Sequence, residues 1–218
     1  MSEDWINRDM AKILVVDDDP KIIFLAKKIL KSSGHSVIGA SGGKEGIKKL
    51  KSARPDLVLL DIMMPDMDGW ETLRMIRGSK GFEEVPVAML TAISLGPDTL
   101  KRREVDELID YIQKPFTKGS LTKKVNEILE ALEEVDRTGS QMKGTGPEKL
   151  AEYREIVKKE LLHENLLATL RENLKTQPRP YEAEITKEAI SSEQEKLQEL
   201  VARREEIERS IADKASME

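Results

Sequence analysis

The chain has 218 residues, of which 35% are charged, 39% hydrophobic and 4% aromatic, and none is cysteine, which excludes disulfide frameworks and thiolate sites. This length allows one full domain and a smaller second one, and the net charge of −5 gives no global electrostatic support for nucleic-acid binding. No apolar run approaches bilayer length and the first ten residues lack a secretory-signal pattern, so we expect no membrane span and a cytoplasmic protein.

Short apolar runs bounded by turn residues predict five β-strands. The runs lie at residues 12–16, 36–40, 57–60, 85–90 and 109–112. Between and after them, apolar residues recur at helical spacing near residues 22–30, 46–50, 70–76, 98–107 and 121–132. Strands that alternate with helices of crossover length form right-handed βαβ units, so this segment is predicted to be an α/β domain with one parallel sheet.

Polar side chains follow four of the predicted strands. Asp17 and Asp18 follow the first, Asp61 the third, Thr91 the fourth and Lys114 the fifth. In an open parallel sheet, ligands bind beyond the carboxyl ends of the strands, so these residues are expected at one edge. A lone aspartate at a strand end can also simply cap a turn, and Asp68 is expected to cap the helix that follows it.

Three carboxylates at one edge repel each other unless a cation lies among them. Their oxygen atoms suit Mg²⁺, which usually takes one or two carboxylates together with a phosphate oxygen and waters. A carboxylate can also attack phosphorus and form an aspartyl phosphate, while Mg²⁺, a lysine and a hydroxyl stabilise the charge on the phosphoryl oxygens. The predicted edge therefore contains every group that carboxylate phosphorylation needs.

Four motifs carry a family resemblance. They are Val-Val-Asp-Asp-Asp-Pro at 15–20, Leu-Asp-Ile-Met-Met-Pro-Asp-Met-Asp-Gly at 60–69, Leu-Thr-Ala at 90–92 and Tyr-Ile-Gln-Lys-Pro-Phe at 111–116. In this order and spacing, the segment 11–135 resembles the receiver domain of two-component response regulators. The resemblance implies a doubly wound, flavodoxin-like sheet of five parallel strands in the order 2-1-3-4-5.

The resemblance also implies a role for each motif residue. Asp61 is the implied phosphoacceptor, and Asp17 and Asp18 hold Mg²⁺ together with Asp61 and the backbone carbonyl of Met63. Thr91 and Lys114 contact the phosphoryl group, and Tyr111 is the aromatic switch residue that moves with Thr91. The implied phosphodonor is a sensor histidine kinase. Such a protein is a signalling module that catalyses only its own phosphoryl transfer and dephosphorylation, and is not a metabolic enzyme.

The remaining sequence predicts an all-α segment. A glycine-rich, polar stretch at 136–148 is predicted to be a linker, and residues 149–218 to form two long helices with a proline break near 176–180. In the second helix Ile190, Leu197, Leu200, Ile207 and Ile211 lie near a heptad seam that Arg204 interrupts. These helices are expected to form an antiparallel hairpin or a coiled coil, within one chain or in a homodimer, or to bind a protein partner.

Two other functions stay open at this stage. From residue 140 onward there are 14 Lys and Arg against 17 Asp and Glu, a balance of −3, and the sequence shows no helix-turn-helix spacing. Nucleic-acid binding is therefore not expected. The alternative is a transcriptional regulator with an atypical DNA-binding output domain. His163-Glu164 faintly resembles a histidine phosphoacceptor and suggests a phosphorelay, whereas its register with the apolar residues of its helix predicts a packed histidine. The leading hypothesis is a phosphorylation-dependent response regulator that signals through its helical segment.

Overall fold

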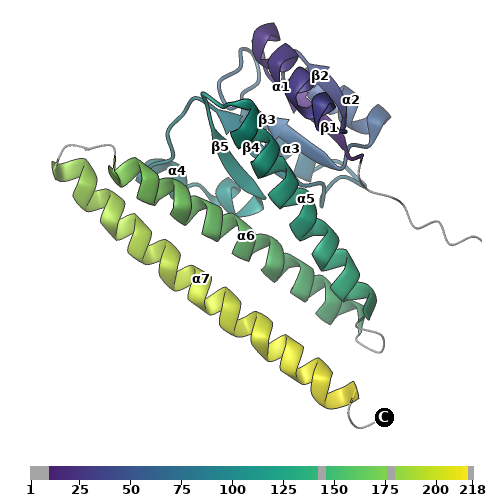
Figure 1. The fold of residues 1–218 in the computed structure, drawn as a ribbon, viewed down its shortest axis with the longest axis vertical. Coiled ribbons are helices and arrows are strands. Elements are labelled where there is room, and N and C mark those ends of the chain that lie inside the picture. Colours follow the sequence, from purple (N-terminus) through teal and green to yellow (C-terminus); the bar gives the residue numbers. More distant parts are fainter. Residues whose placement is uncertain (1–9, 142–145, 176–179, 216–218) are drawn as a thin grey trace, which may run out of the picture. The chain divides into compact units, whose positions relative to one another are not determined.

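The computed structural model describes residues 10–141, 146–175 and 180–215, and Figure 1 shows its fold. Five parallel strands form one sheet in the order β2-β1-β3-β4-β5, which confirms the predicted topology. The strands are β1 (Lys12–Val16), β2 (Ser36–Ala40), β3 (Leu57–Leu60), β4 (Val87–Thr91) and β5 (Asp110–Gln113). All four residues of β3 are buried, as expected for a strand that is covered on both faces.

Helices connect the strands, and two of them begin at an aspartate that caps the helix with its side chain. The helices are α1 (Pro20–Ser32), α2 (Gly43–Ala53), α3 (Gly69–Arg77), α4 (Pro97–Leu100), the 3₁₀-helix η1 (Arg103–Glu107) and α5 (Lys118–Gln141). The side chain of Asp19 caps α1, and Asp68 caps α3 by accepting a hydrogen bond from the amide of Glu71 at 2.7 Å, as predicted. The helix expected at 98–107 is divided, because Arg102 between α4 and η1 is extended.

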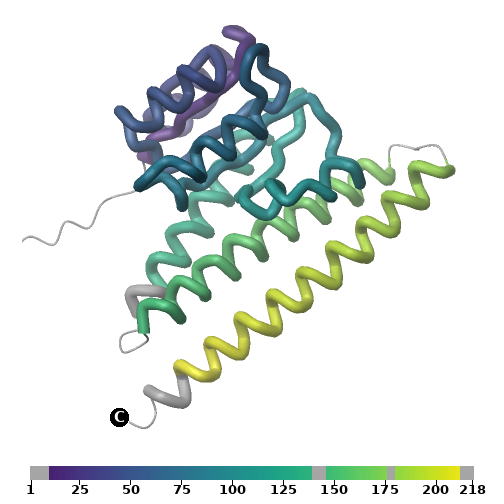
Figure 2. The backbone as a smooth tube through the Cα atoms, turned by 180° about the vertical axis from the view of Figure 1, so that it is seen from behind, coloured from purple at the N-terminus to yellow at the C-terminus, as the bar shows by residue number. Residues whose placement is uncertain are grey.

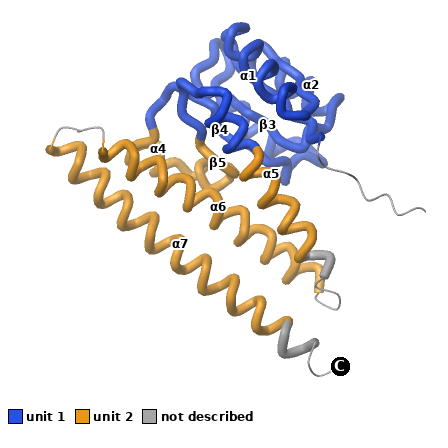
Figure 3. The backbone as a smooth tube through the Cα atoms, in the orientation of Figure 1, with its two compact units in different colours: residues 1–94, 112–125 blue, residues 95–111, 126–218 orange. Residues whose placement is uncertain are grey.

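The chain divides into two compact units, which Figure 3 shows in different colours. The first consists of residues 1–94 and 112–125, and the second of residues 95–111 and 126–218. The segment from Leu95 to Tyr111, which contains α4 and η1, therefore groups with the C-terminal helices. The linker expected at 136–148 is helical as far as Gln141, where α5 ends, and residues 142–145 lie outside the described part.

The second unit contains two long helices, α6 (Pro147–Lys175) and α7 (Pro180–Ala215), that lie side by side (Figure 2). Most of the break predicted near 176–180 falls outside the described residues, and Pro180 is the first residue of α7. Tyr153 and Ile156 of α6 pack against Ile207 of α7 in a buried cluster. Among the described helices, none combines the length and the apolar character that a membrane crossing requires.

Glu193 of α7 is buried against α6, and its pairing makes stability depend on pH. Burial by itself raises the pKa of Glu193, but hydrogen bonds from His163 and Lys196 outweigh it and hold the pKa below the ordinary value. The ionised carboxylate is therefore favoured in the folded state, and its contribution is present above pH 4.5 and lost as pH falls through the lowered pKa.

We expect Glu193→Gln to lower the free energy of unfolding by about 1–2 kcal/mol at pH 7 and by much less in acid, once the pH has fallen through the lowered pKa of Glu193 and the wild-type carboxylate is protonated. Urea unfolding of both proteins, followed by circular dichroism across this pH range, measures the difference. Glu195→Gln is the matched control, because Glu195 is exposed on the same helix. A pH-independent difference between Glu193→Gln and wild type would contradict this account.

Candidate functional site

Two buried aspartates follow directly from adjacent strands. Asp17 comes after β1 and Asp61 after β3, and the amide of Asp61 donates a hydrogen bond to the carbonyl of Val16 at 2.9 Å. Each carboxylate is also held locally: Oδ1 of Asp17 accepts from the amide of Asp19 at 2.9 Å, and Oδ1 of Asp61 from the amide of Ile62 at 2.8 Å. The sheet register and these two turns therefore fix both carboxylates at the carboxyl end of the sheet.

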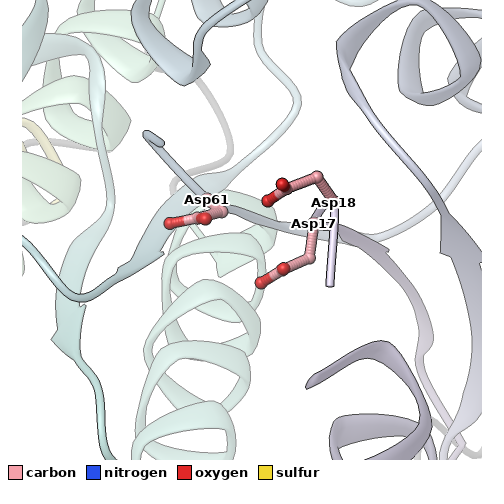
Figure 4. A group of neighbouring side chains, drawn as sticks. All are labelled: Asp17, Asp18 and Asp61. Atoms are coloured by element: carbon pink, nitrogen blue, oxygen red, sulfur yellow. The ribbon is translucent and has the colours of Figure 1, made fainter. Parts of the chain in front are cut away.

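Asp18 completes a group of three carboxylates, as Figure 4 shows. One carboxylate oxygen from each of Asp17, Asp18 and Asp61 lies within 4.8 Å of the others. Asp17 and Asp61 are 1% and 5% exposed, whereas Asp18 is exposed. Clustered hard oxygen donors of this kind, with one exposed member that leaves room for waters, fit Mg²⁺. The predicted Mg²⁺-holding aspartates are thus brought together.

Lys114 supplies the positive charge within this group. Its Nζ lies 2.6 Å from Oδ2 of Asp17 and 3.3 Å from Oδ2 of Asp61, and its side chain is 12% exposed. Burial raises the pKa of Asp17, and the hydrogen bond from Lys114 only partly offsets this effect. The ionised form of Asp17 therefore depends on a nearby cation, which is a physical reason for a lysine at this edge.

Thr91 ends β4 and is fully buried. Its carbonyl accepts a hydrogen bond from the amide of Lys114 at 2.7 Å, and its hydroxyl accepts one from the amide of Ile93 at 3.2 Å. Met63, two residues after Asp61, is 65% exposed, and the role of its backbone carbonyl in holding Mg²⁺ stays a prediction. Tyr111 is buried but belongs to the second unit, so its role as a switch stays a prediction.

Gly69 is a positioning residue that the sequence reasoning missed. A Cβ at this position would lie 2.3 Å from the carbonyl oxygen of Asp61 and 2.7 Å from Cα of Ile62. The amide of Gly69 also donates to the carbonyl of Ile62 at 2.9 Å. Only glycine therefore allows α3 to begin directly against the residue that carries the candidate phosphoacceptor. The sole sequence signal was a glycine at the end of the motif at 60–69.

Comparison with known proteins decides the family. The model of the response regulator receiver domain matches residues 13–126, which is more than half of the chain. The chain belongs to this family. Residues 13–126 therefore form a receiver domain, a class of domain that takes phosphoryl groups from histidine kinases and acts in signalling.

Individual relatives match the receiver segment. The alkaline phosphatase synthesis transcriptional regulatory protein PhoP of Bacillus subtilis is 37% identical over 139 residues, which are 61% of this chain and 53% of PhoP. Protein PilH of Pseudomonas aeruginosa is 32% identical over 122 residues, 55% of this chain and 98% of PilH. The chain thus spans only about half of the PhoP length but nearly all of PilH.

A solved structure agrees with the fold. The chemotaxis protein CheY4 of Vibrio cholerae aligns with a TM-score of 0.52 and 29% identity, covering 55% of this chain and 98% of CheY4. Each of these proteins matches between 55% and 61% of this chain. What they share with it is therefore the receiver segment and not the whole chain.

Proposed function

We propose that Asp61 accepts a phosphoryl group from a sensor histidine kinase in the presence of Mg²⁺, as part of a cytoplasmic response regulator. The observation that carries this proposal is the convergence of the Asp17, Asp18 and Asp61 carboxylates, with Lys114 Nζ against two of them, Asp17 and Asp61. When bound, Mg²⁺ neutralises the charge of the carboxylates and of the phosphoryl oxygens.

The two oxygens of Asp61 have different roles in this proposal. Oδ1 is held by the amide of Ile62, whereas Oδ2 faces Lys114. Oδ2 is therefore the nucleophile: it attacks phosphorus, a P–O bond forms, and the P–N bond to the histidine of the kinase breaks with the electron pair leaving on nitrogen. Lys114 and the hydroxyl of Thr91 stabilise the charge on the phosphoryl oxygens in this step.

Phosphorylation by a small acyl phosphate donor tests the assignment. We expect wild-type protein to gain one phosphoryl group that depends on Mg²⁺, and Asp61→Ala to gain none, as measured by intact-protein mass spectrometry. Asp66→Asn is the matched control in the same loop, since Asp66 is exposed and asparagine tolerates its φ of 65°. Stoichiometric labelling of Asp61→Ala would refute the proposal.

We further propose that the helical C-terminal segment is the output element. Within the second unit, Nδ2 of Asn173 in α6 donates a hydrogen bond to the carbonyl of Leu95 at 3.0 Å, and α4 contacts α7. Leu95 follows Thr91 by four residues in the chain, so a change at Thr91 acts on a segment that α6 holds directly. This contact supports a switch in which phosphorylation changes how the C-terminal helices bind a protein partner or a second copy.

Hydrogen exchange measures this coupling. We expect Mg²⁺ with beryllofluoride, a phosphoryl mimic, to change amide exchange both in residues 95–111 and in the last turns of α6 around Asn173. Asp61→Ala is expected to show no such change. If exchange changes only around Asp61 and Thr91, the C-terminal helices are not the output.

The phosphorelay alternative receives less support. His163 is 4% exposed, and its Nδ1 is bonded to Glu193 at 2.5 Å, as expected for a packed histidine. A histidine that passes phosphate to another domain has to be accessible to that domain. We therefore assign His163 to the packing of α6 against α7.

A further inference from the structure

The seam between α6 and α7 is interrupted by charged residues on both helices. Seam positions alternate in steps of three and four residues, which is the heptad spacing of paired helices. They are Tyr153, Ile156, Glu160, His163, Leu167 and Leu170 on α6, and Ile190, Glu193, Leu197, Leu200, Arg204 and Ile207 on α7. The helices run in opposite directions (Figure 1). An apolar seam alone does not select one partner, but buried charged residues can.

The first charged contact joins Glu160 to Arg204. Nε of Arg204 donates to both carboxylate oxygens of Glu160, at 3.0 and 2.9 Å, and its Nη1 donates to Glu208 at 3.0 Å. The side chain of Glu160 is 11% exposed. Burial raises the pKa of Glu160, so its carboxylate needs the guanidinium opposite it to stay ionised.

The second charged contact joins His163 to Glu193. Nδ1 of His163 lies 2.5 Å from Oε2 of Glu193, and Nζ of Lys196 lies 2.8 Å from Oε1 of the same carboxylate. The side chains of His163 and Glu193 are 5% and 3% exposed. A partner helix that offered no donor here would leave one oxygen of a buried carboxylate without a hydrogen bond, which is strongly unfavourable.

A second copy of α7 is the competing partner that the sequence allows. Two antiparallel α7 helices crossing between Gln198 and Glu199 would place Glu193 of each copy against Arg204 of the other. The same arrangement would place Lys196 of each copy beside Arg203 of the other, which is a like-charge contact. In the hairpin, by contrast, Arg203 pairs with Glu152 of α6 at 2.6 Å.

We infer that α7 pairs with α6 of its own chain. The Arg203–Glu152 contact selects this partner over the α7 helix of a second copy, which would place Arg203 beside Lys196 instead, and the contacts Glu160–Arg204 and His163–Glu193 fix the register of the hairpin. The C-terminal segment is then a hairpin that acts as one folded element, and not a coiled coil that holds two chains together. This inference is independent of phosphorylation at Asp61, so it can fail while the proposed function holds, and the reverse.

A charge exchange across the seam tests the inference in the full-length protein. We expect the single variants Glu160→Arg and Arg204→Glu to melt at least about 5 °C below wild type, because each leaves like charges in the seam. The double variant Glu160→Arg/Arg204→Glu restores opposite charges and is expected to recover most of the loss. An unchanged melting temperature for Glu160→Arg would overturn the inference, since an α7 pair does not involve Glu160.

Mixing the two single variants separates pairing within a chain from pairing between chains. If α6 of one copy paired with α7 of another, each single variant would supply the charge that the other lacks, and mixing after unfolding and refolding would restore stability. Pairing within the chain predicts no such recovery.

The mass of the wild-type protein, measured by light scattering, gives a further test that needs no variant to fold. We expect the monomer mass of 24.6 kDa. A wild-type dimer that dissociates on Arg204→Glu would overturn the inference.

Discussion

Replacing Lys114 with methionine is expected to slow phosphorylation of Asp61 by roughly 10²–10³-fold while leaving the fold intact. Among the described residues, Lys114 is the one whose positively charged group contacts Asp17 and Asp61. Methionine keeps most of the length of the unbranched side chain and removes its charge and its hydrogen-bond donors. The step that loses most is the one in which negative charge gathers on the phosphoryl oxygens. Mass spectrometry of the labelled protein over time gives the rate.

The same variant should respond more strongly to Mg²⁺. Without Lys114, no cation among the described residues contacts the buried carboxylates of Asp17 and Asp61, so binding of a divalent ion gains more free energy than in wild type. Mg²⁺ should therefore raise the melting temperature of Lys114→Met by more than it raises that of wild type.

Lys118→Met is the matched control, because Lys118 is exposed and lies four residues further along the chain. It removes the same formal charge without touching the carboxylates, and is expected to label at the wild-type rate. If both variants slow labelling equally, the effect comes from net charge and not from the position of Nζ. If Lys114→Met labels as fast as wild type, Lys114 has no part in the transfer.

The sheet and the convergence of the site could be predicted from the sequence because both follow from local patterns. Four apolar residues before Asp61 predict a strand buried on both faces, and parallel strands bring their carboxyl ends to one edge. That geometry is enough to place Asp17 and Asp61 close together, as the structure does. The division of the helix expected at 98–107 into α4 and η1 was missed, because helical periodicity does not report a single extended residue such as Arg102.

The charged contacts of the helical segment could be predicted only in part. Arg204 stood out as a polar residue in an apolar seam, but its partner Glu160 lies on another helix, and the pattern of one helix carries no information about its register against the next. Glu193 was missed for the same reason: in sequence it is one of many glutamates on α7, and only the packing of α6 shows that it is buried against His163.

Replacing Gly69 with alanine is expected to have the largest effect on stability of any single methyl group added to the receiver. The added Cβ would lie 2.3 Å from the carbonyl oxygen and 3.0 Å from the carbonyl carbon of Asp61, and 2.7 Å from Cα of Ile62. All three are backbone atoms, which cannot rotate away as the end of a side chain can. Either α3 moves away from the sheet or the Asp61 backbone shifts, and we expect a loss of about 3 kcal/mol or more in the free energy of unfolding.

Gly119→Ala separates this clash from a general effect of changing glycine at a helix start. Gly119 is the second residue of α5, and a Cβ there would have its nearest neighbour, Oγ1 of Thr117, at 3.9 Å. Alanine is the better helix former, so Gly119→Ala is expected to leave stability unchanged or raise it by up to about 1 kcal/mol. Urea unfolding followed by circular dichroism compares the two variants with wild type. Equal stabilities would mean that the start of α3 does not constrain Asp61. A large loss for Gly69→Ala alone, with slower labelling of the fraction that stays folded, would show that the close approach of α3 holds the phosphoacceptor in place.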